Sequence, residues 1–408
     1  MKPFLASTLL LLATVSINGC ARSEAERATP AATTLSFQEI ESPAAPGSGE
    51  PNLHTSADGE VFLSWVEPGV ETRHALRFAR LEEEAWSAPQ TIAGGDDWFV
   101  NWADFPSVVA LNEGLAAHFL ARSGPDTYAY DVKITQSNDD GQTWSPAVRP
   151  HDDGTLTEHG FVSMLPWPDG RLLAVWLDGR NMAGGHGSGG AMTLRTATLD
   201  RDGNRYDELA LDQRVCDCCP TSAARTPNGA VVVYRDRSDD EQRDIAIIRL
   251  NQEGWSTPRL VHEDGWQIAG CPVNGPAVAA AEARVAVAWF TAAQDTPRVK
   301  VAFSTDEGVT FGPPTTVDDG RPVGRVDVVV LPGGDALVSW IEKTDDDAEI
   351  RVRRVHPDGT AAPSITAAPT SAARASGFPH LARRGPEVYL VWTDAADPSA
   401  IRTAVAKF

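Results

Sequence analysis

The sequence predicts an all-β protein, a seven-bladed β-propeller. Three observations support this prediction: a long repeat, the aromatic residue that ends an apolar segment in each repeat, and the turns inside the repeats. Seven short apolar segments each end on an aromatic residue, and successive aromatic residues are 54, 57, 58, 55, 51 and 52 positions apart. Four short antiparallel strands that recur at such a period are typical of propeller blades. A ring of six blades is the alternative. The apolar segments are 61–65, 115–119, 172–176, 230–234, 285–289, 336–340 and 388–392.

Each repeat also contains the other strands that a blade needs. A short strand precedes the apolar segment and often begins at a proline, as at Pro106 and Pro276. A strand of alternating character follows it, as in 350–353, and several repeats add a fourth strand after a Trp-Ser turn, as at Trp144-Ser145. Such a small sheet cannot bury both faces alone, so we expect the aromatic residues to pack between neighbouring blades.

The two ends of the repeat region predict how the ring closes. The seventh repeat stops after its third strand, 400–406, and the segment 34–41 (TLSFQEIE) is a strand without a repeat of its own. We expect these two segments to pair, because pairing removes exposed strand edges. Residues 35–408 would then form a single domain.

The N-terminus resembles a bacterial lipoprotein signal. Met1-Lys2 is followed by an apolar run, 4–15, and by Gly19-Cys20, a pattern too short for a membrane-spanning helix. The resemblance implies a signal peptide at 1–19, lipidation of Cys20 and a flexible tether at 20–34. It places the protein in the cell envelope, held by its lipid at an outer membrane and facing the periplasm or the surface. An ordinary signal with an incidental cysteine is the alternative.

The charge of the chain limits its partners. The formal net charge is −21, from 35 basic and 56 acidic residues. Such an excess of acid excludes nucleic acid as a partner and disfavours strongly anionic ligands. We expect a monomer whose contacts are the membrane, through the lipid, and a carbohydrate or metal ligand.

Two turns carry a recognisable motif. Segments 137–144 (SNDDGQTW) and 304–311 (STDEGVTF) both fit the pattern S-x-D-x-G-x-T-W/F. In that pattern the Ser and Asp side chains bond the backbone of the turn and the glycine adopts positive φ. The chain therefore resembles the sialidase-like, Asp-box (BNR-repeat) propellers over its whole mature length. The resemblance implies that these turns are structural and lie far from any binding site.

Four cysteines are expected on one face of the propeller. Cys216, Cys218 and Cys219 precede the first strand of the fourth repeat, and Cys271 precedes that of the fifth. In propellers of this kind such leading loops surround the central channel, together with the loop that carries His186. In an oxidising envelope the thiols predict disulfides, Cys216–Cys219 with Cys218–Cys271. The crowded C-x-C-C spacing predicts instead a copper(I) or zinc site that His186 joins.

Other polar and aromatic residues fall in loops of the same face and are candidates for ligand binding. The acidic residues either cap loop backbone or face a cation or sugar hydroxyls. The arginines bind a carboxylate ligand or form ion pairs, and the tryptophan is a plug between blades or a platform for a sugar ring. The candidates are Asp178, Arg180, Arg235, Asp236, Arg237, Trp266 and Asn274.

The sequence thus predicts a lipid-anchored propeller that binds a glycan or a soft metal ion on the face that carries the cysteines. One alternative is an exo-sialidase or another glycoside hydrolase, with Tyr128, Tyr130 or Tyr234 beside Glu158 as its nucleophile pair. The F/Y-R-I-P motif usual in sialidases is missing from the sequence. A scaffold for protein partners is the third hypothesis.

Overall fold

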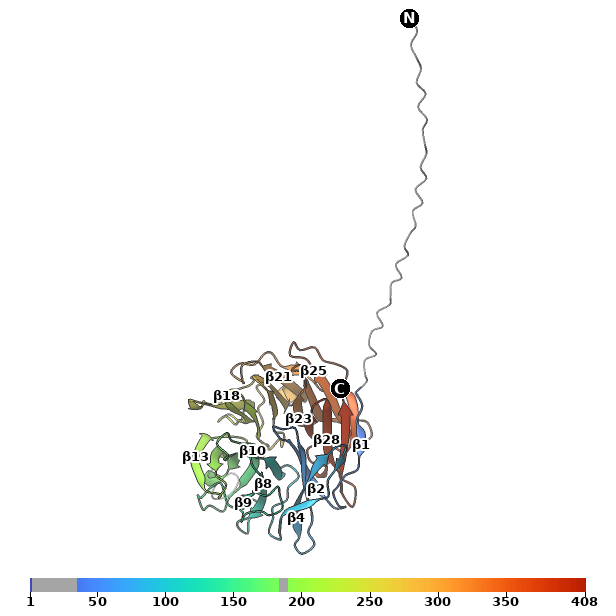
Figure 1. Ribbon diagram of the computed structural model, residues 1–408. Helices are drawn as coiled ribbons and strands as arrows, with labels where there is room; N and C mark the ends of the chain where they lie inside the picture. Colours follow the sequence, from blue (N-terminus) through green and yellow to red (C-terminus); the bar gives the residue numbers. More distant parts are fainter. Residues whose placement is uncertain (2–34, 183–189) are drawn as a thin grey trace. The chain divides into compact units, whose positions relative to one another are not determined.

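The structure is a computed structural model of the chain, and it describes Met1, residues 35–182 and residues 190–408. Leu35–Phe408 form one compact unit, separate from Met1–Thr34. The described residues of this unit form seven sheets that follow one another around a ring (Figure 1). The prediction of a seven-bladed, all-β propeller is confirmed. Cys20, the expected signal and tether, and His186 lie outside the described residues.

Blades 1 to 4 come in chain order. Blade 1 contains β2 (Gly49–Thr55), β3 (Val61–Pro68), β4 (His74–Glu82), β5 (Ala85–Trp86) and β6 (Gln90–Gly95). Blade 2 contains β7 (Ser107–Ala110), β8 (Leu115–Arg122) and β9 (Tyr130–Ser137). Blade 3 contains β10 (His159–Pro166), β11 (Leu172–Asp178), β12 (Thr193–Leu199) and β13 (Arg205–Asp212), with the 3₁₀ turn η1 (Arg180–Met182). Blade 4 contains β14 (Ser222–Thr226), β15 (Gly229–Arg235), β16 (Ile245–Asn251), β17 (Gly254–Trp255) and β18 (Arg259–Leu260).

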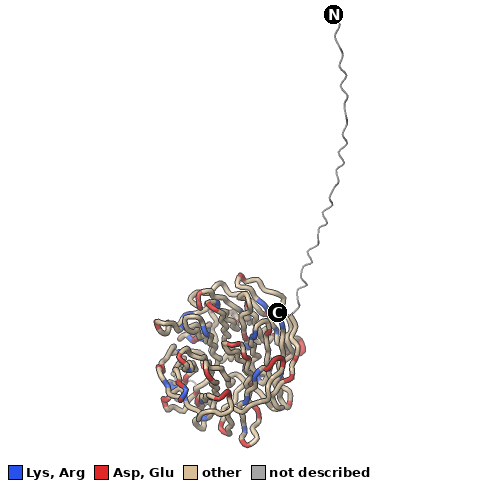
Figure 2. Tube along the Cα trace, viewed as in Figure 1, with Lys and Arg blue, Asp and Glu red and all other residues tan. Residues whose placement is uncertain are grey.

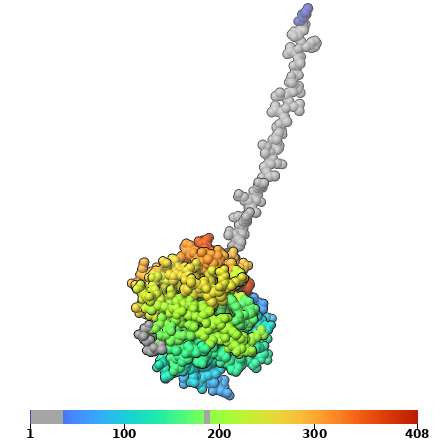
Figure 3. All heavy atoms as spheres, turned by 90° about the vertical axis from the view of Figure 1, so that its left-hand side faces the viewer, coloured from blue at the N-terminus to red at the C-terminus, as the bar shows by residue number. Residues whose placement is uncertain are grey.

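Blades 5 to 7 complete the ring. Blade 5 contains β19 (Ala277–Ala281), β20 (Arg284–Thr291), β21 (Arg298–Ser304) and β22 (Thr315–Thr316), with η2 (Ala293–Asp295). Blade 6 contains β23 (Pro322–Val330), β24 (Ala336–Lys343), β25 (Ala348–Val355) and β26 (Ile365–Thr370). Blade 7 contains β27 (His380–Arg384), β28 (Glu387–Asp394), β29 (Ala400–Lys407) and β1 (Gln38–Ile40), and η3 (Arg374–Ser376) precedes it. In Figure 3, the green and yellow segments of the middle of the chain form most of one face.

The ring closes as the sequence predicts. Strand β1 pairs antiparallel with β29, with Gln38 opposite Val405 and Ile40 opposite Thr403. The preceding side chains of Leu35 and Phe37 pack against the buried cluster between blades 6 and 7. The first strand of the described unit therefore completes the last blade. Over the described residues, no helix has the length and apolar character needed to cross a membrane.

Blade 2 departs from the expected four strands. Its outer position holds only an isolated bridge between Ile134 and Val148 in place of a strand after Trp144-Ser145. The segment contains Pro146 and Pro150. Proline lacks the backbone N–H that a continuous ladder requires, so pairing stops after a single bridge.

The acidic residue two positions after a strand-ending tryptophan has a structural partner. In three blades its carboxylate accepts the indole N–H of that tryptophan, which is fully buried. A buried indole N–H needs such an acceptor. We expected these carboxylates to cap loop backbone. In these three blades they also accept a hydrogen bond from a buried tryptophan side chain. The pairs are Trp65–Glu67 (2.8 Å), Trp176–Asp178 (2.8 Å) and Trp340–Glu342 (2.6 Å).

The two motif turns have the local hydrogen bonds that their sequences predict. Ser137 Oγ accepts the N–H of Gly141 at 2.8 Å, and Asp139 Oδ1 accepts the N–H of Thr143 at 2.8 Å. The glycine has φ +87°, a conformation that side chains disfavour. Turn 304–311 repeats this pattern with bonds of 2.9 and 2.8 Å.

Candidate functional site

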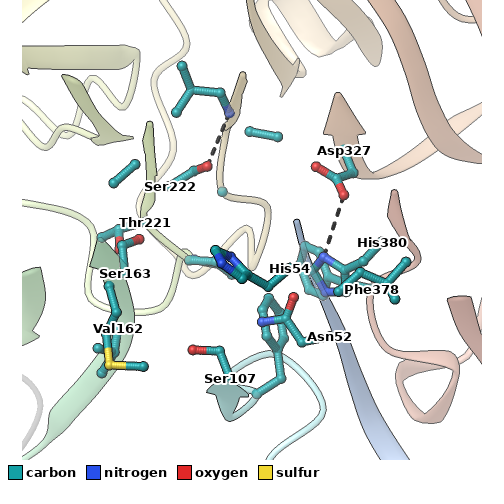
Figure 4. Close-up of a pocket in the computed structure, with 18 of the residues that line it drawn as sticks. Asn52, His54, Ser107, Val162, Ser163, Thr221, Ser222, Asp327, Phe378 and His380 are labelled. Carbon is teal, nitrogen blue, oxygen red and sulfur yellow. Dashed lines mark hydrogen bonds and ion pairs between the residues drawn. The ribbon is translucent and has the colours of Figure 1, made fainter. Parts of the chain in front are cut away.

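The first strands of the blades line a channel along the ring axis. A cavity of about 240 Å³ lies there. Figure 4 shows His54 near the middle of this cavity, Ser163 and Ser222 on one side, and Asp327 and His380 on the other. Burial lowers the pKa of His54 to about 4, so this imidazole is neutral at physiological pH. The channel wall is therefore polar but carries little positive charge.

Aromatic side chains from the leading loops meet over one end of this channel. The rings of Trp102 and Phe378 stack with centroids 6.0 Å apart, and Phe105 lies 5.8 Å from Phe378. The Arg325 guanidinium covers the Trp102 ring at 4.7 Å and donates to the Gly377 carbonyl. Phe105 and Phe378 also line the cavity. We call Trp102, Phe105 and Phe378 the aromatic plug, because their rings pack together beside the cavity.

The cysteines gather beside the aromatic plug. The sulfur atoms of Cys216 and Cys219 are 3.0 Å apart, and those of Cys216 and Cys218 are 4.0 Å apart. Cys218 packs against the cluster containing Phe378, and Cys271 lies close enough to it for the two thiols to shift each other's pKa. All four are free thiols in the structure. Leading loops of two consecutive blades thus form what we call the thiol cluster, Cys216, Cys218, Cys219 and Cys271.

The thiols differ in burial and charge. Cys216 and Cys219 are buried, Cys218 is half-buried and Cys271 is exposed. Burial acts to raise the pKa of Cys216, but hydrogen bonds from the neighbouring thiols and the Arg243 guanidinium outweigh it and lower this pKa well below its ordinary value. Arg243 donates to Cys216 Sγ at 3.3 Å and is itself buried. A thiolate at Cys216 therefore has the Arg243 cation beside it. Elsewhere in the unit, acidic and basic residues are interspersed (Figure 2).

Arg237, Asp236 and the acidic residues of this loop hold the thiol cluster in place. Arg237 bonds Asp217 at 2.9 Å and Glu241 at 2.7 Å, and Glu241 also accepts from Arg243 at 2.7 Å. Asp236 pairs with Val215, directly before Cys216. Burial raises the pKa of Asp236 to about 6. Of the two roles considered for Arg237, ligand binding and ion pairing, the geometry fits ion pairing.

Arg235, Trp266 and Asn274, three of the predicted ligand-binding residues, are buried and make structural contacts in this geometry. Arg235 is 1% exposed, and its guanidinium donates to the backbone carbonyls of Asn274, Arg243 and Phe290. It also covers the buried Trp266 ring at 4.8 Å. The side chain of Asn274 accepts the backbone N–H of Arg325 at 2.7 Å. All three face the protein interior because they join blades 4, 5 and 6.

Asp178 and Arg180 lie in blade 3 and bond each other. Arg180 donates to both carboxylate oxygens of Asp178 at 2.7 Å. Nearby, the stacked rings of His151 and His159 are 3.9 Å apart and share the Asp153 carboxylate, at 2.9 and 3.3 Å. These side chains are potential metal ligands, but Asp178 also accepts the Trp176 indole and is already neutralised by Arg180. The group is a hydrogen-bonded charge network that joins blades 2 and 3.

Tyr130 and Glu158, one of the pairs that the sequence offered, are in contact in the structure, together with a third buried residue, Asp104, that sequence reasoning missed. The Tyr130 hydroxyl lies 2.9 Å from Glu158 Oε1 and 3.2 Å from Asp104 Oδ2. Asp104 also accepts the N–H of Phe161, which has φ +53°. A Cβ on Gly160 would lie 2.0 Å from Asp104, so this close approach requires glycine. For Asp104 the only sequence signal was the Gly-Phe pair near the start of β10, which periodicity alone does not distinguish.

Asp104 predicts a pH-dependent stability. Burial raises the pKa of Asp104 to about 8, and the Glu158 carboxylate adds to the effect. The folded state therefore keeps a proton that the unfolded chain releases above about pH 4, so stability falls as pH rises from about 4 to 8. The slope attributable to this group reaches up to about 1.4 kcal/mol per pH unit. We expect Asp104→Asn to remove that slope from urea unfolding at pH 5–8. An unchanged slope would contradict this assignment.

The comparisons with known proteins concern the fold. No model of a known protein family matches the sequence, and no curated protein matches it. An ulvan lyase of polysaccharide lyase family PL25 is similar to this chain at 11% identity, over 90% of this chain and 95% of that one, with a TM-score of 0.58. The GH93 α-L-arabinofuranosidase of Fusarium graminearum, solved with arabinobiose, is similar at 14% identity over 91% and 97%, with a TM-score of 0.50. At these identities the likeness shows a shared fold.

Proposed function

We propose that this protein is a lipid-anchored propeller of the bacterial cell envelope whose reduced thiol cluster binds one soft metal ion, copper(I) or zinc. The observation that carries the proposal is the convergence of Cys216, Cys218 and Cys219, with ligand atoms within 4.8 Å of one another. Thiolates are the ligands that copper(I) and zinc prefer. The oxygen-rich sites that magnesium and calcium require have no counterpart among these side chains.

The surrounding charges support bound thiolates. Two or more thiolates in a buried site need positive charge nearby, since unpaired buried charge is costly. Arg243 contacts Cys216 directly, and Arg235 is close enough to Cys219 to lower its pKa, although burial and the other thiols raise that pKa overall. Zinc or copper would supply the remaining positive charge.

The sulfur spacing also fits an ion after a small movement. A zinc–sulfur bond of about 2.3 Å places two sulfurs on one tetrahedral ion about 3.8 Å apart. The Cys216–Cys218 separation of 4.0 Å is close to this value, and the Cys216–Cys219 separation of 3.0 Å is shorter. Cys219 must therefore withdraw slightly when an ion enters, whereas a disulfide requires the same two sulfurs to approach to about 2.05 Å.

A titration of the reduced full-length protein tests the proposal. In detergent and without oxygen, we expect one copper(I) or zinc ion per chain, and at least a tenfold weaker affinity for Cys216→Ser. Cys20→Ala, which removes a cysteine outside the thiol cluster, is the control and should bind like the unchanged protein. Equal affinity of Cys216→Ser and the control would sink the proposal.

A carbohydrate-active enzyme is the second candidate, and one observation favours it. Tyr130, Glu158 and Asp104 are the residue types of a sialidase nucleophile pair and acid, and they lie within hydrogen-bond distance. However, they are 0%, 7% and 3% exposed, so a sugar in solution does not reach them in this structure. We expect no hydrolysis of a sialoside by the purified protein; activity that Glu158→Gln abolishes would reverse this preference.

The lipid anchor is a separate part of the proposal with its own test. A lipid attached at Cys20 would supply the two acyl chains that stable attachment requires. We expect Cys20→Ala to move the protein from the membrane fraction to the soluble fraction and to lose its lipid mass. Unchanged partitioning into detergent would contradict the anchor while leaving the thiol cluster unaffected.

A further inference from the structure

The thiol cluster consists of two pairs that differ in access to solvent. The sulfurs of Cys216 and Cys219 are 3.0 Å apart, and both residues are only 1% exposed. Cys271, which is exposed, lies close enough to Cys218 for each thiol to shift the pKa of the other. The two pairs approach each other through Cys216 and Cys218, at 4.0 Å. The cluster is therefore arranged in series from the surface inward: Cys271, Cys218, Cys216, Cys219.

We propose that this series is a thiol–disulfide relay, in which the exposed pair reacts with a small disulfide from solution and passes the oxidation to the buried pair. The relay needs no bound ion, so it goes beyond the metal site of the proposed function. When oxidised, the same cluster has two fewer thiolates and loses its metal, which makes metal binding dependent on redox state.

The first exchange takes place at the surface. The Cys271 thiolate attacks one sulfur of a small disulfide RSSR, forms a mixed disulfide and releases RS⁻. The Cys218 thiolate then attacks the Cys271 sulfur and releases the second RS⁻. The product is a Cys218–Cys271 disulfide, and both electrons have gone to the two RS⁻ groups.

The second exchange takes the oxidation inward. The Cys216 thiolate attacks Cys218 across the 4.0 Å gap and expels Cys271 as thiolate. Cys219 then attacks Cys216, with which it is already in contact, and expels Cys218. The net change is two thiols and RSSR converted to one buried disulfide and two RSH, with Cys218 and Cys271 reduced again.

The geometry sets this order. Cys216 and Cys219 have almost no solvent access, so a reagent in solution meets Cys271 first. Closing the buried pair from 3.0 Å to the bond length of about 2.05 Å requires about 1 Å of movement. Ring strain disfavours a bond between the adjacent residues Cys218 and Cys219, which leaves Cys216 as the thiol that attacks Cys218 in the second exchange.

The relay is tested on the reduced full-length protein without metal. One equivalent of glutathione disulfide is added, samples are quenched by alkylation over time, and the alkylated cysteines are assigned by mass spectrometry. We expect glutathione on Cys271 first, then the Cys218–Cys271 disulfide, and finally the Cys216–Cys219 disulfide with Cys218 and Cys271 free. Cys271→Ser should slow formation of the buried disulfide at least tenfold. Cys219→Ser should prevent it, and leave Cys218 in a disulfide with Cys271 or Cys216.

Two controls keep the result interpretable. Cys20→Ala should react at the unchanged rate, and thermal melting should show that each variant is folded. Formation of the buried disulfide at the same rate in Cys271→Ser would overturn the relay. Because no metal is present, this failure is distinct from a failed metal titration, which would overturn only the proposed function.

Discussion

Deletion of residues 35–41 is expected to open the ring and cause the largest loss of stability. The deletion removes β1, the partner of β29, and the Leu35 and Phe37 side chains that pack between blades 6 and 7. The lost apolar burial and pairing correspond to about 3–5 kcal/mol, and the bare edge of β29 becomes a template for aggregation. Thermal melting and light scattering of the purified protein measure both effects.

The control for this deletion lies directly upstream. Removing residues 21–34, the expected tether, should leave the melting temperature within about 1 °C of the full-length value, since surface changes rarely exceed a few tenths of a kcal/mol. If removal of 35–41 has as little effect as removal of 21–34, then β1 does not close the ring.

Arg235→Met is expected to cause the second large loss. The arginine is buried, and its donors bond three carbonyls that belong to blade 4 and blade 5. Methionine fills similar space but leaves those carbonyls without partners, at a cost of about 1–3 kcal/mol each. We expect urea unfolding to show a loss of about 3–6 kcal/mol.

Arg237→Met is the matched control for that substitution. Arg237 is two residues away but half-exposed, and its partners are the carboxylates of Asp217 and Glu241. Solvent screening keeps such pairs near 1 kcal/mol or less. Equal losses for the two variants would show that Arg235 does not link the blades, and would reopen its role in binding.

The fold was predictable because its signal repeats. The spacing of strand-ending aromatic residues predicted seven blades, and the unassigned segment 34–41 predicted the closing strand that β1 provides. The outer strand of blade 2 was predicted wrongly, because Pro146 and Pro150 limit pairing there to one bridge. A local backbone constraint outweighed the repeat at that position.

The site was predictable only where chemistry and topology coincided. The sulfur atoms of Cys216, Cys218 and Cys219 lie close together in the structure, whereas the place of Cys271 beside them was inferred from blade register. The roles of the arginines could not be predicted from the sequence. An arginine that binds a ligand and one that binds backbone carbonyls have the same sequence pattern. The aromatic plug was missed for a similar reason, since Trp102 and Phe378 belong to distant loops that only the closed ring brings together.

X-ray absorption at the metal edge, on full-length protein purified without chelator or oxygen, tests the metal-binding claim most directly. We predict close to one copper or zinc ion per chain, coordinated by sulfur at about 2.2–2.3 Å, and loss of that signal in Cys216→Ser. Two results would contradict the account. The first is a protein that has four free cluster thiols, lacks stoichiometric metal and does not take up copper(I) or zinc. The second is a bound ion that only oxygen and nitrogen atoms coordinate.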